Sequence, residues 1–138
     1  MGVRVPRRPS LWLAVFLFIG AACTEEPGGL RGARAAADAS EVVRDIFAGR
    51  YRNVTEHIDE TMKEGLSEES LAAARREYED LFGTFVSMGA PELLERGSFT
   101  VINIPLHMSE REGQARITYD ERNQIVGLYL LRLGVPVR

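Results

Sequence analysis

The sequence contains few of the residues that most often form disulfide bonds, metal sites and positively charged binding surfaces. Its 138 residues include one cysteine, one lysine and two histidines. One cysteine cannot form an internal disulfide, so disulfide bonds give no information on the compartment. A single lysine argues against a polybasic membrane-binding surface. Two histidines are too few for a zinc site built on histidine, because zinc takes three or four ligands.

A clustered positive charge is also missing from the body of the chain. Residues 1–22 carry three arginines and no acid, and the rest of the chain has 14 basic and 20 acidic residues. Neutralising the phosphates of a nucleic acid needs clustered Lys and Arg, so we expect no nucleic-acid partner. With 45% apolar and 27% charged residues, the composition is that of an ordinary globular protein, and the length fits one domain.

The chain lacks the motifs of the common hydrolases. No GxSxG segment is present, and no Ser, Asp and His follow one another in the order that α/β-hydrolases use. His57 and Glu60 lie one helical turn apart, but two ligands make a poor metal site. The acidic segment EYED follows directly after Arg75 and Arg76, a pattern typical of a solvated helix face. We therefore expect no enzymatic activity, no cofactor and no metal.

A short apolar run near the N-terminus is the strongest feature that the sequence does have. LWLAVFLFIGAA, residues 11–22, follows three arginines and ends in small residues, which is the order of regions in a secretory signal peptide. As a helix these residues span about 18 Å, less than the hydrocarbon core of about 30 Å. We predict that residues 1–22 are a signal peptide and that the protein is exported.

The junction IGAAC resembles the lipobox of bacterial lipoproteins in Ala21, Ala22 and Cys23. It departs from that pattern at Gly20, where the family usually has leucine or another branched aliphatic residue. The resemblance implies that Cys23 is acylated, becomes the N-terminus and anchors the protein to a membrane. Thr24 after the cysteine implies the periplasmic side of the outer membrane, if the source is Gram-negative.

Two alternatives to a lipid anchor stay open at this junction. An ordinary signal peptidase also accepts Gly20 and Ala22, which would give a secreted or soluble periplasmic protein. An uncleaved anchor is the second alternative. Residues 23–35, rich in Gly, Ala and charge, are expected to be the lipidated cysteine and a flexible tether. Residues 36–138 are expected to form one domain.

Helical periodicity fills the first half of this domain. Apolar residues recur at spacings of three and four in three stretches, within residues 42–47, 51–62 and 71–82. Ser67 suits the N-cap of the third helix, and Gly83 suits its end. From residue 84 the period changes to two. The segment 84–97 is expected to be an edge strand interrupted at Gly89 and Pro91, because proline cannot donate to a ladder.

Three further strands are predicted within residues 98–108, 113–120 and 124–133. Helices followed by an antiparallel meander indicate the α+β class. The expected architecture is about three N-terminal helices packed on one face of a curved, four-stranded antiparallel sheet, which is a cone-like arrangement.

Two segments, LFGTFVSMGAPE and FTVINIPLHMSEREGQARITYDERNQIVGLYL, carry a family resemblance. Over roughly residues 38–133 the chain resembles the bacterial domain-of-unknown-function family 3887, whose members often precede an α/β-hydrolase. The order of elements also resembles the cystatin-like and nuclear-transport-factor-2-like cone folds. The matching residues are packing residues, so the resemblance implies a fold and leaves activity open. Any hydrolytic role that the family implies would need a separate hydrolase chain.

Candidate site residues lie in the sheet. Asn103 and His107 share strand parity with Phe99 and Val101, so they either line a pocket between helices and sheet or lie on the outer sheet face. Tyr78 and Tyr129 are added to the candidate pocket.

The last strand is apolar on both sides, with Ile125, Tyr129, Leu131 and Leu133 on one and Val126, Leu128 and Leu130 on the other. Helices cover only one face of the sheet, so the second needs another cover: a homodimer, an envelope protein partner, or burial within a strongly bent sheet. The sequence thus predicts a non-enzymatic cell-envelope lipoprotein domain that acts as a binding or protein-interaction module. The alternatives are a pocketed domain that binds or turns over a small apolar ligand, and an accessory domain of a separate hydrolase.

Overall fold

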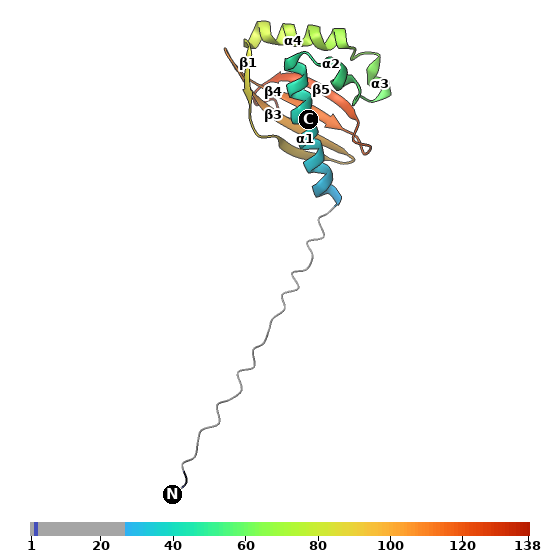
Figure 1. Cartoon of the computed structure of the whole chain (residues 1–138), viewed down its shortest axis with the longest axis vertical. Helices are drawn as coiled ribbons and strands as arrows, with labels where there is room; N and C mark the ends of the chain where they lie inside the picture. Colours follow the sequence, from blue (N-terminus) through green and yellow to red (C-terminus); the bar gives the residue numbers. More distant parts are fainter. Residues whose placement is uncertain (1, 3–26) are drawn as a thin grey trace.

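A computed structural model describes residue 2 and residues 27–138 of the chain. The predicted signal peptide and Cys23 lie outside the described residues. Within them, helices form one layer and an open antiparallel sheet the other (Figure 1). The α+β class is therefore confirmed. The elements are α1 Pro27–Ala48, α2 Tyr51–Thr55, α3 Glu60–Lys63, α4 Glu68–Phe82, β1 Phe85–Met88, β2 Glu92–Arg96, β3 Phe99–Met108, β4 Glu112–Tyr119 and β5 Ile125–Arg132.

Helix α1 begins at Pro27, inside the segment expected to be a tether. The structure corrects the predicted boundary near residue 36, because residues 27–35 are helical and dock on the sheet. Ala35 has no exposed surface. A Cβ on Gly32 would lie 2.3 Å from Leu93 Cδ1, so a larger residue at this position would require the Leu93 side chain to move. The small side chains that suggested a tether instead let the helix pack against the sheet.

The expected amphipathic helix over residues 51–62 is divided in two. Between α2 and α3, the chain pairs with β5: the Asp59 amide donates to the Ile125 carbonyl at 2.9 Å, and the Ile125 amide donates to the His57 carbonyl at 2.8 Å. The Asp59 carboxylate then accepts from the Thr61 amide at 3.2 Å and caps α3. An aspartate side chain that accepts a hydrogen bond from a nearby backbone amide favours the N-cap of a helix over a helix interior. Asp59 therefore begins a new helix, which explains why the predicted helix is divided at this point.

Helix α4 follows the sequence prediction. Ser67 Oγ accepts from the Ser70 amide at 3.1 Å at the N-terminus, and Glu68 and Glu69 lie in the first turn. Gly83, at φ 87°, ends the helix. Both ends are therefore determined by local sequence.

The sheet has five strands in the described residues, where the sequence predicts four. β3, β4 and β5 pair in order, while β1 and β2 both pair with the free edge of β3, β1 along its C-terminal half and β2 along its N-terminal half. The expected interruption at Gly89 and Pro91 thus separates two strands. The Gly89 amide donates to the Pro105 carbonyl at 2.8 Å. Pro105 lacks an N–H, and it sits in mid-strand β3 beside this gap, where the ladder is already broken.

The core lies between the helices and the sheet. A β-bulge between Thr118 and Tyr119 brings Ile125 opposite Tyr119, so Ile125 joins the core and does not share a face with Tyr129 as the alternation predicted. The residues of this sheet face without exposed surface are Ile102, Ile104, Leu106, Ala115, Ile117, Tyr119 and Ile125. No helix in the described part of the chain is both long and apolar enough to span a membrane.

Candidate functional site

The sheet face opposite the helices carries a groove of about 640 Å³. Its floor is apolar, and three of the nearby side chains are largely exposed: Phe99 at 45%, Tyr129 at 56% and Leu133 at 49%. The lining residues are Arg96, Phe99, Val101, Arg116, Thr118, Tyr129, Leu131, Arg132, Gly134, Val135, Pro136, Val137 and Arg138.

The last residues of the chain form one wall of this groove. The side chain of Gln114 donates to the Val135 carbonyl at 3.2 Å, and Arg116 donates to the carbonyls of Val135 and Pro136. Gly134, at φ 84°, lets the chain turn back over β4 after β5. Part of the second apolar face of the sheet is thus covered by residues 134–138 of the same chain.

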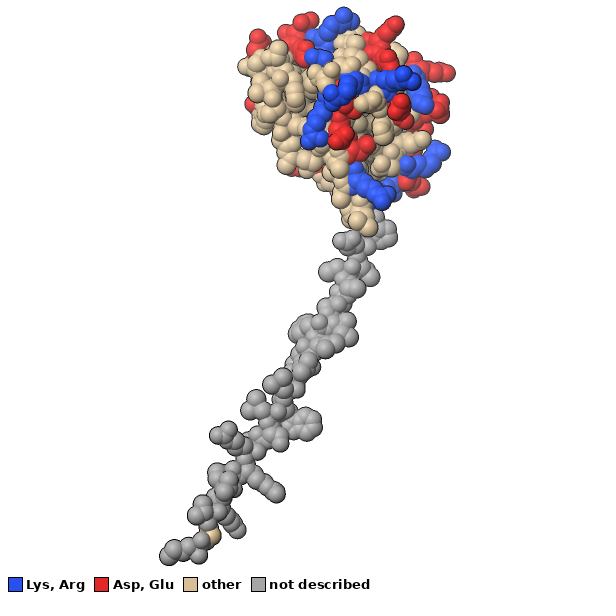
Figure 2. All heavy atoms as spheres, viewed as in Figure 1, with Lys and Arg blue, Asp and Glu red and all other residues tan. Residues whose placement is uncertain are grey.

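Arginines are the charged side chains of the groove. Arg96, Arg116, Arg132 and Arg138 line it, and among residues 27–138 no aspartate or glutamate does. The ion pairs found among the described residues involve none of these four arginines. On the face drawn in Figure 2, by contrast, acidic and basic side chains are interspersed. The groove is therefore a positively charged site on an acidic domain.

Arg116 lies at the centre of this arrangement. Cross-strand pairing places it between Asn103 on β3 and Tyr129 on β5. Its Nε donates to Asn103 Oδ1 at 2.8 Å, which fixes the guanidinium against the sheet. Asn103 is 8% exposed, so its amide oxygen depends on this bond.

The four candidate pocket residues do not form one site, although Tyr78 and Tyr129 both line a hollow between α4 and β5. Asn103 lies on the open face beside Arg116, which is the outer-face alternative, and Tyr129 also lines the groove. His107 is on the same face near the other end of β3, with its Nδ1 2.7 Å from Glu112 Oε2. Tyr78 lies across the sheet in the helix layer. Sequence reasoning missed Arg96, Arg116 and Arg132, although Arg116 alternates in step with Gln114 and Thr118 along β4.

Tyr78 lines a second, smaller hollow of about 310 Å³ between α4 and β5, where Leu128 and Leu130 also lie. Its hydroxyl donates to the Leu131 carbonyl at 2.8 Å. Burial raises the pKa of Tyr78 to about 12, so the phenol is neutral at physiological pH. This hydrogen bond therefore connects helix α4 to β5, the strand at one edge of the sheet.

A polar cluster joins α1, the α2–α3 connection and β4. The Tyr119 hydroxyl donates to Asp38 Oδ2 at 2.6 Å, and Asp38 Oδ1 lies 3.7 Å from His57 Nδ1. Burial, and then the bond to Asp38, raise the pKa of Tyr119 well above its usual range. Tyr119 has no exposed surface, so this cluster fixes α1 to the sheet. Within residues 27–138 no group of three or more potential metal ligands occurs, and His57 pairs with Asp38 and not with Glu60.

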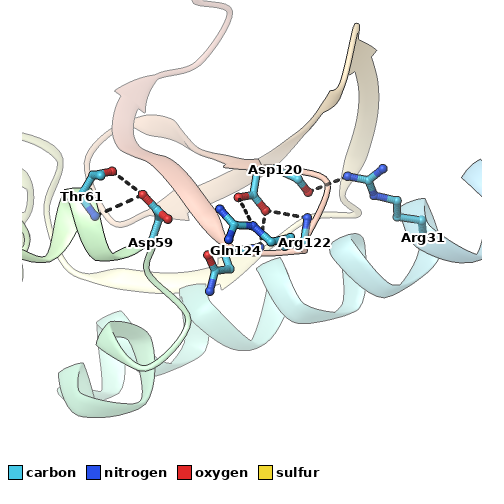
Figure 3. Close-up of polar contacts among 6 residues, drawn as sticks. All are labelled: Arg31, Asp59, Thr61, Asp120, Arg122 and Gln124. Carbon is cyan, nitrogen blue, oxygen red and sulfur yellow. Dashed lines mark hydrogen bonds and ion pairs between the residues drawn. The ribbon is translucent and has the colours of Figure 1, made fainter.

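A third polar group lies at the turn between β4 and β5 (Figure 3). The Asp120 carboxylate accepts from the amides of Arg122 and Gln124, both at 2.9 Å, and Arg31 of α1 donates to the Asp120 carbonyl at 2.6 Å. Arg31 and Arg122 also line a hollow of about 370 Å³. The Asp120 side chain thus stabilises the turn, and the Asp120 carbonyl connects the turn to α1.

The described residues thus define a small α+β domain with one sheet face under helices and one open face that carries an arginine-lined groove. The chain belongs to a family described as protein of unknown function (DUF3887), whose model matches residues 39–128. This membership confirms the resemblance in the sequence. A search of curated proteins found no match, and neither did a search of solved structures.

Proposed function

We propose that this chain is a non-enzymatic binding domain of the bacterial cell envelope and that the open sheet face is its binding surface. The observation that carries the proposal is the groove beside Tyr129 and Arg116. Its volume falls in the range of about 300 to 1,000 Å³ that small-molecule sites occupy. An apolar floor with a few fixed polar groups is the usual composition of such a site.

The charged groups of the groove favour binding over catalysis. General base and nucleophilic catalysis need a side chain that releases or accepts a proton near neutral pH. Arginine keeps its proton under these conditions, and arginines are the charged side chains of the groove. A permanent cation of this kind can hold an anionic ligand, but it serves neither as a general base nor as a nucleophile.

The location in the envelope rests on the N-terminal sequence. Residues 1–22 have the regions of a signal peptide, and Cys23 stands at a lipobox-like junction. The intact mass of the membrane-extracted protein tests the anchor. We expect a chain that starts at Cys23 and carries diacylglycerol and one fatty acid, and we expect Cys23→Ser to leave the membrane fraction. An unmodified chain would refute the anchor.

Ligand screening tests the binding surface. We expect one chemical class to raise the melting temperature of the protein and Tyr129→Asp to abolish that rise, because the new carboxylate enters the groove. Val86→Asp is the matched control, since Val86 is exposed on β1 and does not line the groove. Stabilisation that survives Tyr129→Asp unchanged would place the binding surface elsewhere.

Self-association is tested separately by light scattering coupled to size-exclusion chromatography. A dimer that Tyr129→Asp dissociates would mean that a second copy of the chain covers the open face. A monomer over a wide concentration range leaves the groove free for a ligand.

A further inference from the structure

We propose that the groove binds a single-chain amphiphile with a carboxylate head, an alkanoate such as decanoate, whose head lies at Arg116 and whose chain lies over the apolar floor. This inference rests on the proposed function, because it names the ligand class of the same open sheet face. Three features of the groove carry it.

The first feature is the state of the Arg116 guanidinium. It is partly buried, and its contacts are neutral: the Asn103 amide oxygen at 2.8 Å and the carbonyls of Val135 and Pro136. These contacts use three of its five N–H groups and fix its orientation. A partly buried cation without a carboxylate partner gains from an anion, and a fixed guanidinium matches the two oxygens of a carboxylate.

The second feature is the positive charge around Arg116. Arg96 and Arg132 line the same groove and are exposed, and none of the lining residues in the described part of the chain is acidic. Cations that converge on a hollow raise the local concentration of anions. The charge pattern therefore selects an anionic head over a neutral or cationic one.

The third feature is the apolar floor beside these cations. Val101 and Leu131 form its deeper part, and the rings of Phe99 and Tyr129 form its exposed part. A hydrated ion such as acetate would leave this surface in water. Each methylene of a ligand that lies on it removes apolar surface from water, so an alkyl chain suits the site.

Isothermal titration calorimetry of the full chain tests the proposal, with Cys23→Ser to prevent acylation and without detergent. The probes are decanoate below its micellar concentration, 1-decanol, acetate and a hexaglutamate peptide. We expect saturable binding of decanoate that weakens as salt is added. We expect 1-decanol to bind about tenfold more weakly, since it lacks the charge, and acetate to show no binding because it lacks the chain.

Substitutions locate the head group. Arg116→Gln is expected to lower the affinity for decanoate about tenfold and to leave the affinity for 1-decanol unchanged. Arg76→Gln is the matched control, because Arg76 is an exposed arginine of α4 across the sheet, and it should bind decanoate like the parent chain. If Arg116→Gln does not fold, the double variant Arg96→Gln/Arg132→Gln changes only exposed side chains and should weaken decanoate several-fold.

Three results would overturn the inference: equal affinity for decanoate and 1-decanol, hexaglutamate binding tighter than decanoate, or no effect of the groove arginines. Hexaglutamate binding would assign the groove to an acidic protein segment. If a different class stabilises the protein in a way that depends on both Tyr129 and Arg116, the inference fails and the proposed binding surface stands. Failure of every probe and every class at the open face would overturn both.

Discussion

Tyr78 connects two layers of the protein through one hydroxyl, which donates to the Leu131 carbonyl at 2.8 Å. Its ring stacks on Phe82, with centroids 4.3 Å apart, and only 5% of the residue is exposed. The phenol is therefore both a packing group and a hydrogen-bond donor that must stay protonated.

At the residue scale, Tyr78 makes stability depend on alkaline pH. Its pKa is about 12 in the folded chain, and an unfolded tyrosine titrates near 10. A raised folded pKa gives stability that is fully present below about pH 10 and is lost as pH rises through 12, because the unfolded chain releases the proton first. We expect Tyr78→Phe to cost about 1 kcal/mol at pH 7, for the lost bond, and to reduce the loss of stability between pH 10 and 12.

Urea unfolding followed by circular dichroism at pH 8, 10 and 11 measures this effect. Tyr119, whose pKa is also raised, is present in both proteins, so the difference between them isolates Tyr78. The same pH dependence in the parent and in Tyr78→Phe would contradict the prediction.

At the scale of elements, Gly113 determines how α4 docks on β4. A Cβ at this position would lie 1.7 Å from the Tyr78 hydroxyl oxygen and 3.0 Å from its ring. We expect Gly113→Ala to destabilise the protein by about 1 to 3 kcal/mol, as overpacking does. The cost should be smaller in the Tyr78→Phe background, because the nearest clashing atom is gone.

Thermal unfolding of the four proteins of this double-mutant cycle gives the coupling energy. Gly65→Ala is the control, since its nearest atom would be the Met62 carbonyl at 3.9 Å, and we expect little change. Additive effects of the Gly113 and Tyr78 substitutions would show that they do not interact.

The N-cap of α4 is a second prediction at this scale. Ser67→Ala removes the acceptor of the Ser70 amide and is expected to cost about 1 kcal/mol of stability. Ser67→Asp supplies another acceptor and should keep the stability of the parent. Chemical denaturation measures both, and equal losses in the two variants would show that the side chain does not cap the helix.

At the scale of the whole molecule, the first turns of α1 belong to the folded domain. A chain that starts at residue 36 loses the bond from Arg31 to Asp120 and the cover that Gly32 and Ala35 give the sheet. We expect it to be less stable than residues 27–138 by about 2 kcal/mol or more, from one hydrogen bond and the apolar surface exposed. Equal melting temperatures of the two chains would mean that residues 27–35 are a tether and not part of the folded domain.

The sequence alone was sufficient to predict the features that depend on a single short segment. The capped helix α4, the change of period after Gly83 and the break at Gly89 and Pro91 were all predicted, and so was the α+β class. Helix caps, glycine positions and the alternation of apolar residues depend on residues that are close in the sequence, so they can be recognised without knowledge of the fold. The signal-peptide and Cys23 predictions are of the same kind and stay predictions.

The tertiary structure alone decided what depends on partners far apart in the chain. Residues 27–35 belong to the domain because Gly32 and Ala35 pack in the folded chain, and Ile125 turns inward because of a bulge opposite Tyr119. The groove exists because residues 134–138 fold back over Arg116 and Gln114. The composition indicates an acidic chain without a basic cluster, whereas strand register places Arg96 of β2 and Arg116 of β4 on the same open face, at one hollow. The spacing of apolar and polar residues along the chain determines the helices and strands. Only the packing of these elements determines which side chains share a site.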